Sequence, residues 1–297
     1  MIAAQAYSAV DGYRRDRQDG GDALVVDRVS WLPNNWLSVI VGKAAYSGPL
    51  LRVRRSSDNA ETDIYPAANG VLDTTALLAF CGAGSGYVTK MYDQTGQARD
   101  STQTTAGSQW RIVATGALET INGIVTPRSV TNTSYMADYE FAASGADWTF
   151  GSVASSLSVT GNTQNVIGRD GAGYRTTGIY TQFSSTATAT NFNRTGANVV
   201  VQSGANAVAN TVGIYYLTHT SANVATAYFN GAAGTPSAAM TWTTGSLGEY
   251  RQGSYSTTAV TLLGTIQETW SFPQALTATD LNIIKTWESR KFGVTVV

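Results

Sequence analysis

The sequence predicts an all-β fold, a sandwich or jelly roll, on three observations. Short segments in which apolar and polar residues alternate recur between about residues 44 and 272, among them "LLRVRR", "SGYVTKMYD" and "TVGIYYLTHT". Turn-forming pairs such as Asn230-Gly231 and Asp170-Gly171 lie among these segments. Long helical patterns do not come between them, which favours packed sheets over an alternation of strands and helices.

The first 43 residues differ from the rest of the chain. Their first 28 positions hold nine charged residues: Asp11, Arg14, Arg15, Asp16, Arg17, Asp19, Asp22, Asp27 and Arg28. The apolar stretch "VSWLPNNWLSVIVG" follows, with Trp31 and Trp36 on either side of a Pro-Asn-Asn turn. We expect residues 1–43 to be an N-terminal arm that serves as an assembly element, and residues 44–297 to be the sandwich domain. A flexible tail followed by a strand is the alternative for the arm.

Two helices are expected within this β pattern. In "LDTTALLAFCG", Asp73 is a suitable N-cap for a short internal helix with Leu77, Leu78 and Phe80 on its buried side. In "ALTATDLNIIKTWESRKFG", Thr277 is a suitable N-cap, Asp280 resembles the last member of a capping box, and Gly293 is a C-terminal stop. The second helix would close the sandwich.

The composition excludes several classes of function. Charged residues make up 13% of the chain and the net charge is −1, so no overall field attracts nucleic acid or an anionic membrane. With one Cys and one His, neither a disulfide framework nor a histidine-rich zinc site can form, and we expect no metal and no cofactor. We expect His219 to be a packed or surface residue and Cys81 to be a buried thiol. Because the N-terminus has no signal-peptide pattern and no apolar run reaches membrane-helix length, synthesis in a cytoplasm without membrane insertion is expected.

The stretch "AYSGPLLRVRRSSDNAETDI" concentrates charge in a chain that is otherwise poor in it. It holds three arginines and three acids: Arg52, Arg54, Arg55, Asp58, Glu61 and Asp63. The balance of signs and the lack of interleaved aromatic residues favour surface ion pairs over nucleic-acid binding.

Three segments resemble the catalytic domain of the α-L-arabinofuranosidase B family. They are Ala45–Ile64, Gly70–Gln103 with the block Tyr92, Asp93, Gln94 and Gly96, and Leu262–Gly293. The resemblance implies a concanavalin-A-like β-sandwich. Similar segments are found in bacteriophage and prophage structural proteins, which keep the sandwich and do not all keep the enzyme.

The positions that the resemblance assigns to catalysis hold other residues here. It implies a nucleophilic Glu two residues before an Ile-Tyr pair, where this chain has Thr177, and an acid in the loop Gly253–Val260, which has no carboxylate. It also implies a disulfide from Cys81 to the position that Gly86 occupies. Since a retaining glycosidase needs two carboxyl groups, Asp170 would have to pair with Glu249 or Glu268. Glu268 is expected instead to pair with an arginine at the end of the sheet.

From these observations we expect a structural protein of a bacteriophage virion: a tail, fibre or capsid-surface subunit with a non-catalytic, lectin-like sandwich. Its location would be the virion surface, and its partners other virion subunits and symmetry copies of itself. A host cell-surface polysaccharide is a further candidate ligand. The alternative is a glycan-active enzyme of the arabinofuranosidase type, or a free carbohydrate-binding protein.

Two sets of side chains are the candidate sites. Aromatic and polar residues near the family's cleft would bind a glycan: Tyr174, Arg175, Tyr180, Trp242 and Tyr250. Residues of the arm would form the assembly interface: Arg14, Arg15, Arg17, Trp31 and Trp36.

Overall fold

The structure is a computed structural model. It describes residues 24–131, 133–137, 147–156, 164–171, 174–182, 190–195, 197–205, 207–222, 224–237, 250–253 and 262–297. For most of residues 164–202, and for Tyr250, it describes the course of the backbone and not the side chain.

Two large sheets hold most of the described strands. The six-stranded sheet has the order β1–β20–β11–β16–β17–β18. Its strands are β1 (Asn35–Ser38), β11 (Trp148–Ser156), β16 (Gly213–His219), β17 (Ala225–Phe229), β18 (Ala232–Ala233) and β20 (Gly264–Phe272). Every ladder in this sheet is antiparallel.

The twelve-stranded sheet has the order β15–β14–β13–β12–β19–β10–β5–β4–β2–β3, with β6 and β7 continuing from β4. Its first half in the sequence consists of β2 (Leu51–Arg55), β3 (Glu61–Ile64), β4 (Gly86–Met91), β5 (Ser101–Thr102), β6 (Trp110–Ala114), β7 (Ala117–Leu118) and β10 (Met136–Ala137). Its second half consists of β12 (Gln164–Gly171), β13 (Tyr174–Gln182), β14 (Thr190–Thr195), β15 (Ala197–Gln202) and β19 (Tyr250–Gln252). A separate hairpin joins β8 (Thr120–Ile121) to β9 (Ile124–Val125).

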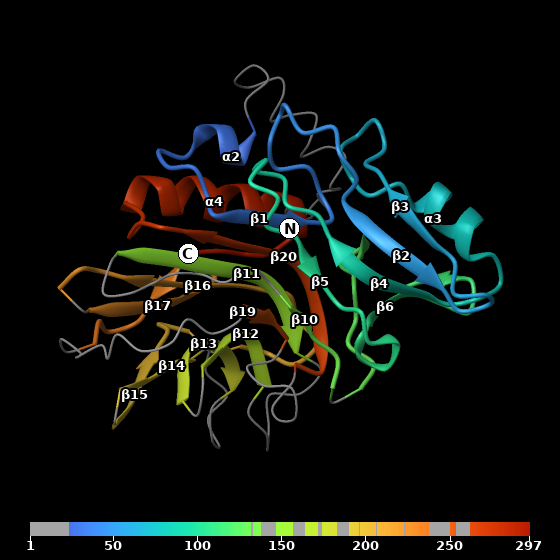
Figure 1. The fold of residues 1–297 in the computed structure, drawn as a ribbon. Coiled ribbons are helices and arrows are strands. Elements are labelled where there is room, and N and C mark those ends of the chain that lie inside the picture. The colour runs from blue at the N-terminus through green and yellow to red at the C-terminus, as the bar shows by residue number, and fades with distance from the viewer. Residues whose placement is uncertain are drawn as a thin grey trace, which may run out of the picture.

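The six-stranded sheet lies between two other layers (Figure 1). Helix α4 (Ala278–Phe292) covers one of its faces, and strands β12–β15 lie against the other. Alternation along β16 explains the division, because Tyr216 joins the core cluster beneath α4 whereas Tyr215 and Leu217 join the cluster between the sheets. The predicted β-sandwich with a closing helix is confirmed.

The helix-capping predictions are also confirmed. Helix α3 (Thr74–Cys81) begins after Asp73, whose carboxylate accepts a hydrogen bond from the backbone N–H of Ala76 at 3.0 Å. Helix α4 begins after Thr277, whose hydroxyl accepts from the Asp280 N–H at 3.1 Å, and it ends at Gly293 in the left-handed region. The remaining helical turns are α2 (Val25–Arg28) and the 3-10 turn η1 (Ala106–Ser108).

The described part of the expected N-terminal arm, residues 24–43, is built into the sandwich. Strand β1 pairs with β20 so that Trp36 lies opposite Trp270, and α2 packs against α4. Leu24 and Leu37 are completely buried in the same core cluster as α4. A cut after residue 43 would therefore remove a strand of the six-stranded sheet. Residues 1–23 of the arm lie outside the described residues.

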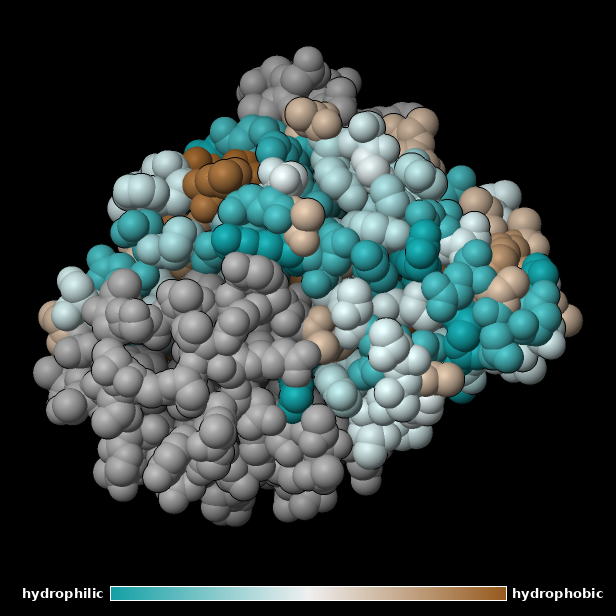
Figure 2. Space-filling view, viewed as in Figure 1, coloured by the Kyte–Doolittle hydropathy of each residue, from teal (hydrophilic) through white to brown (hydrophobic). Residues whose placement is uncertain are grey.

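The described surface is mostly polar. On the face drawn in Figure 2, hydrophilic residues cover most of the coloured surface, with small apolar areas between them. Among the residues that the structure describes, the large apolar side chains exposed to solvent are Trp31, Leu32, Tyr65, Val130, Val208 and Val297. None of the described helices is long and apolar enough to span a bilayer.

Candidate functional site

The position expected for a nucleophile lies on β13, the third strand from the β15 edge of the twelve-stranded sheet. Thr177 on β13 pairs with Arg169 on β12 and with Asn193 on β14. Arg169 in turn pairs with Tyr250 on β19. The backbone therefore sets these four residues in one row across four neighbouring strands.

The structure brings most of the predicted glycan-binding residues to this part of the sheet. Tyr174, Arg175 and Tyr180 lie on β13, and Tyr250 lies on β19, with β12 between the two strands. Trp242 lies outside the described residues. The shared location leaves glycan binding by these residues a prediction.

Two glutamates meet where α4 packs on the six-stranded sheet, which the sequence analysis did not foresee. Glu268 on β20 and Glu288 on α4 are both completely buried. The indole Nε1 of Trp36 donates to Glu268 Oε2 at 3.2 Å, and that of Trp270 donates to Glu288 Oε1 at 2.7 Å. The indoles of Trp36 and Trp270 are stacked, with ring centroids 6.0 Å apart. The expectation that Glu268 pairs with an arginine is wrong, because its partners are an indole, a serine and a second carboxyl group.

Burial and mutual repulsion govern the protonation of this pair. Removal from water raises the pKa of Glu268 well above its usual range, and the charge of Glu288 raises it further. Burial likewise raises the pKa of Glu288. Glu268 Oε1 and Glu288 Oε2 are buried without a hydrogen-bond partner among the described residues, which adds to the cost of ionising either carboxyl. Since no substrate can reach completely buried groups, this pair is structural and not catalytic.

The arginine-rich stretch forms ion pairs at the surface, as predicted. Arg52 Nε lies 2.7 Å from Asp63 Oδ1, and Arg55 Nη2 lies 2.7 Å from Asp58 Oδ2. Arg54 bonds to the amide oxygen of Gln109 instead of to an acid. The cluster is a structural feature of the edge strands β2 and β3 and their turn.

The Tyr92–Gly96 block attaches strand β1 to the rest of the molecule. Asp93 Oδ1 accepts from the Trp36 N–H at 3.0 Å. The Gln94 side chain accepts from the Gly42 N–H at 2.7 Å and donates to the carbonyls of Ser38 and Ile40. Every polar atom of the Gln94 amide is thereby used on the backbone of residues 38–42. The most specific motif of the sequence thus has a structural role in the described residues.

The predicted assembly residues fall into three places. Arg14, Arg15 and Arg17 lie outside the described residues. Trp31 is 47% exposed, as an interface residue could be. Trp36 is completely buried and stacked on Trp270, so its ring is not available to another protein.

The lone cysteine and the lone histidine are both packed in the interior. Cys81 is free and 4% exposed, as predicted. His219 is completely buried and its ring stacks on Trp148, with centroids 4.9 Å apart, which confirms the packed alternative. Within the described ranges, no three His, Cys, Asp or Glu side chains are grouped so as to hold a metal ion.

Fold and site together define a two-sheet β-sandwich with a helix over one sheet and an open array of strands, β12–β15, on the other side. The family model that matches the sequence is described as the catalytic domain of α-L-arabinofuranosidase B, and it covers residues 40–137. This segment includes strands β2–β10 and the block that attaches β1.

Curated relatives match the same region. An α-L-arabinofuranosidase of Hypocrea jecorina is 42% identical over 64 residues, which are 22% of this chain and 13% of that protein. A probable α-L-arabinofuranosidase B of Aspergillus clavatus is 43% identical over 65 residues, again 22% of this chain and 13% of the relative. The matched segment therefore spans only a small part of each relative.

Solved structures extend the likeness to nearly the whole fold. An arabinofuranosidase crystallised with arabinofuranosyl-α-1,2-xylobiose superimposes with a TM-score of 0.68 at 16% identity, covering 92% of this chain and 65% of the other. At this identity the superposition shows a shared fold.

These findings correct the expected function. The family model and the fungal relatives are arabinofuranosidases, so the interpretation as a non-catalytic bacteriophage structural protein is wrong. The expectation that the chain is not an enzyme is contradicted by the same matches, and so is its assignment to the virion surface. A residue other than Glu at position 177 does not outweigh the match over residues 40–137.

Proposed function

We propose that this chain is a glycoside hydrolase domain that cleaves α-L-arabinofuranosyl linkages. The observation that carries the proposal is the match of residues 40–137 to the arabinofuranosidase B catalytic model. The substrate class would be polysaccharides or oligosaccharides with arabinofuranosyl groups. The superposition over 92% of the chain supports the same scaffold beyond the matched segment.

Hydrolysis with retention requires a nucleophilic carboxylate and a carboxylic acid about 5–5.5 Å apart. The acid protonates the leaving oxygen while the carboxylate bonds to the anomeric carbon, and water then releases the sugar. Glu268 and Glu288 cannot serve, because both are completely buried.

We assign the two roles to Asp170 and Glu249. Asp170 is the next residue after Arg169 on β12, and Glu249 is the residue before Tyr250 in the sequence. Arg169 and Tyr250 face each other across the antiparallel β12–β19 ladder. Asp170 and Glu249 thus each adjoin in sequence a member of this opposed pair, and this is the reason for assigning them.

Hydrolysis of an aryl α-L-arabinofuranoside by the full chain tests the proposal. We expect turnover by the unmodified protein, and a loss of about 10²–10⁴-fold in kcat for Asp170→Asn and for Glu249→Gln. Glu61→Gln is the control, because Glu61 is an exposed acid on β3, at the other end of the twelve-stranded sheet.

Two outcomes would count against these proposals. No turnover of the aryl substrate or of arabinoxylan by the unmodified chain would refute hydrolysis. Undiminished turnover in both variants would refute the assignment of Asp170 and Glu249, but it would not refute the proposed hydrolase activity.

A further inference from the structure

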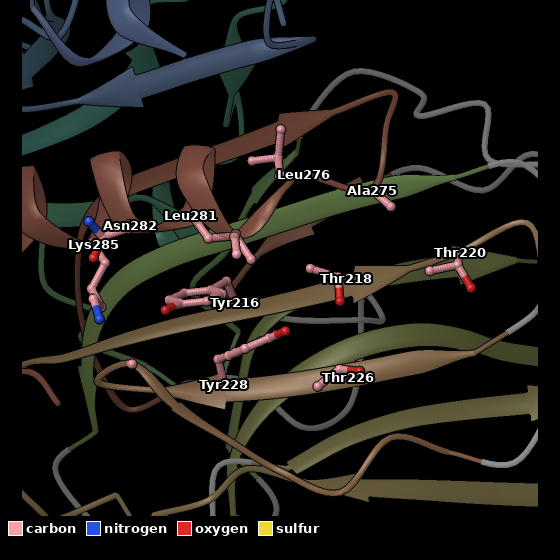
Figure 3. A pocket seen from close by; sticks show the side chains of 12 residues that line it. Tyr216, Thr218, Thr220, Thr226, Tyr228, Ala275, Leu276, Leu281, Asn282 and Lys285 are labelled. Carbon is pink, nitrogen blue, oxygen red and sulfur yellow. The ribbon is translucent and has the colours of Figure 1, made fainter. Parts of the chain in front are cut away.

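A groove lies beside α4 on the outer face of the six-stranded sheet. Its volume is about 450 Å³, within the range of small-molecule sites. Strands β16 and β17 form its floor, and the first turns of α4 with the segment before them form one wall (Figure 3). The described lining residues come from β16, β17, α4 and the segments beside them and not from β12, β13 or β19, the strands that carry or adjoin the residues assigned to catalysis.

The strand register arranges the floor as two rows. Tyr216 lies directly opposite Tyr228, and Thr218 lies directly opposite Thr226. The two tyrosine rings are stacked, with centroids 4.8 Å apart and an interplanar angle of 20°. An aromatic surface is therefore followed along the strands by a pair of hydroxyl groups, and Figure 3 shows both rows on the side that faces α4.

The helix leaves this part of the sheet uncovered because it is anchored further along. Trp270 of β20 donates to Glu288, and Trp36 of β1 contacts Trp287 edge to face, so α4 is fixed over β1 and β20. Tyr216 and Thr218 on β16 are buried at its margin, whereas Tyr228 and Thr226 on β17 are only half-buried. The Tyr228 ring is the aromatic surface that a ligand can reach.

The polar groups of the groove suit an uncharged ligand that is rich in hydroxyls. Among the residues that the structure describes, no carboxylate lines the groove, and the one cation that does, Lys285, donates to the backbone carbonyl of Val297 at 2.7 Å. Threonine hydroxyls both donate and accept hydrogen bonds, and so does the amide of Asn282 at the rim. A flat aromatic surface with placed hydroxyls and an amide is the combination that a sugar ring requires.

We propose that this groove is a carbohydrate subsite for a neutral, pentose-containing oligosaccharide. The identity of the sugar rests on the proposed function, because an enzyme that removes arabinofuranosyl groups acts along a pentose-bearing polymer. The subsite would hold a stretch of that polymer on the opposite side of the six-stranded sheet from β12–β15. Its role is to retain the polymer, and it takes no part in bond cleavage.

Affinity electrophoresis of the full chain in gels that contain arabinoxylan tests the proposal, with titration of xylo-oligosaccharides by calorimetry as the second measurement. Asn282→Trp places a bulky ring at the rim from an exposed helix position and should weaken binding about tenfold. Thr279→Trp is the matched control: it adds the same ring to an exposed position of α4 that does not line the groove. Tyr228→Ala removes the aromatic surface and should weaken binding at least as much.

The expected result is retardation of the unmodified chain and of Thr279→Trp, and its loss in the two groove variants. Equal retardation of all four proteins, or none for the unmodified chain, would refute the subsite. Retardation only in gels that contain an acidic polysaccharide would also refute it, because a neutral ligand is the claim. Hydrolysis of the aryl arabinofuranoside tests the hydrolase proposal separately. If the chain binds arabinoxylan but shows no turnover, the hydrolase proposal is refuted and the carbohydrate subsite in the groove is not.

Discussion

Carboxyl groups have opposite environments in two regions of this molecule. In the family-matched region, residues 40–137, the hydrogen bond from Arg52 lowers the pKa of Asp63, and that from Arg55 lowers the pKa of Asp58. In the α4 layer, burial raises the pKa of Glu268 and Glu288. The first region exposes its charges in pairs, and the second buries two acids together under stacked indoles. We therefore expect the α4 layer to dominate both stability and its dependence on pH.

The largest effect should come from the tryptophan that joins the two regions. Trp36→Ala removes a completely buried indole, its stacking on Trp270 and its hydrogen bond to Glu268. Loss of a buried tryptophan costs about 3–5 kcal/mol, and urea denaturation measures the change in the free energy of unfolding.

A second tryptophan in the same segment provides the control. Trp31 is 47% exposed, so Trp31→Ala should change stability by no more than about 0.5 kcal/mol. Similar costs for the two variants would contradict the placement of β1 inside the sandwich.

The next effect is a fall in stability with rising pH. Because the folded-state pKa values of Glu268 and Glu288 are raised, the folded protein binds more protons than the unfolded chain between about pH 4.5 and about 8. Stability from these groups is therefore complete below about pH 4.5 and is lost as pH rises through about 8. The slope should approach about 1.4 kcal/mol per pH unit for each extra proton bound. Urea denaturation at pH 5, 6.5 and 8 measures it.

Two variants assign that slope to the buried pair. Glu288→Gln cannot ionise and keeps an oxygen for the Trp270 indole, so it should reduce the pH dependence by its own share, and Glu268→Gln combined with it should flatten the slope. Asp63→Asn is the control. The pKa of Asp63 is lowered, so its contribution to stability is lost only as pH falls, and the slope between pH 5 and 8 should persist in this variant. Tyr216 and Lys291 are also buried near the helix, but a slope that survived in the double variant Glu268→Gln/Glu288→Gln would show that the two acids are not its source.

Local sequence predicted those parts of the fold that depend on local chemistry. Asp73 and Thr277 cap their helices by bonds to residues three positions away, and such short spacing can be read from the sequence. The burial of Trp36 cannot be predicted from its neighbours in the sequence, because its partners, Asp93 and Glu268, are distant in the chain and only the folded sheet brings them to it.

The candidate sites follow the same division. Tyr216 and Tyr228 each stand in an alternating segment, but they form one surface only because the β16–β17 register sets them opposite each other. Glu288 gives no signal of its own in the helix, since its burial depends on Trp270 of β20. Thr177 stands where the resemblance implies a nucleophilic Glu, but one position does not determine the class of protein.

The smallest effect on stability should come from a disulfide introduced into the matched region, which has Cys81 but no second cysteine to pair with it. Cys81 lies next to Gly86: a Cβ atom added to Gly86 would lie 2.6 Å from the Cys81 sulfur. In a disulfide this separation is about 3 Å, so a small rotation of the Cys81 side chain would let Gly86→Cys form the bridge that the resemblance implies. Closing so short a loop should stabilise the protein by about 2 kcal/mol under oxidising conditions, less any strain from Val53, which lies 3.2 Å from the added Cβ.

Urea denaturation with and without reductant measures the gain, and Gly86→Cys combined with Cys81→Ala is the control that cannot bridge. Two titratable thiols in the oxidised, folded variant would show that Cys81 does not face this position.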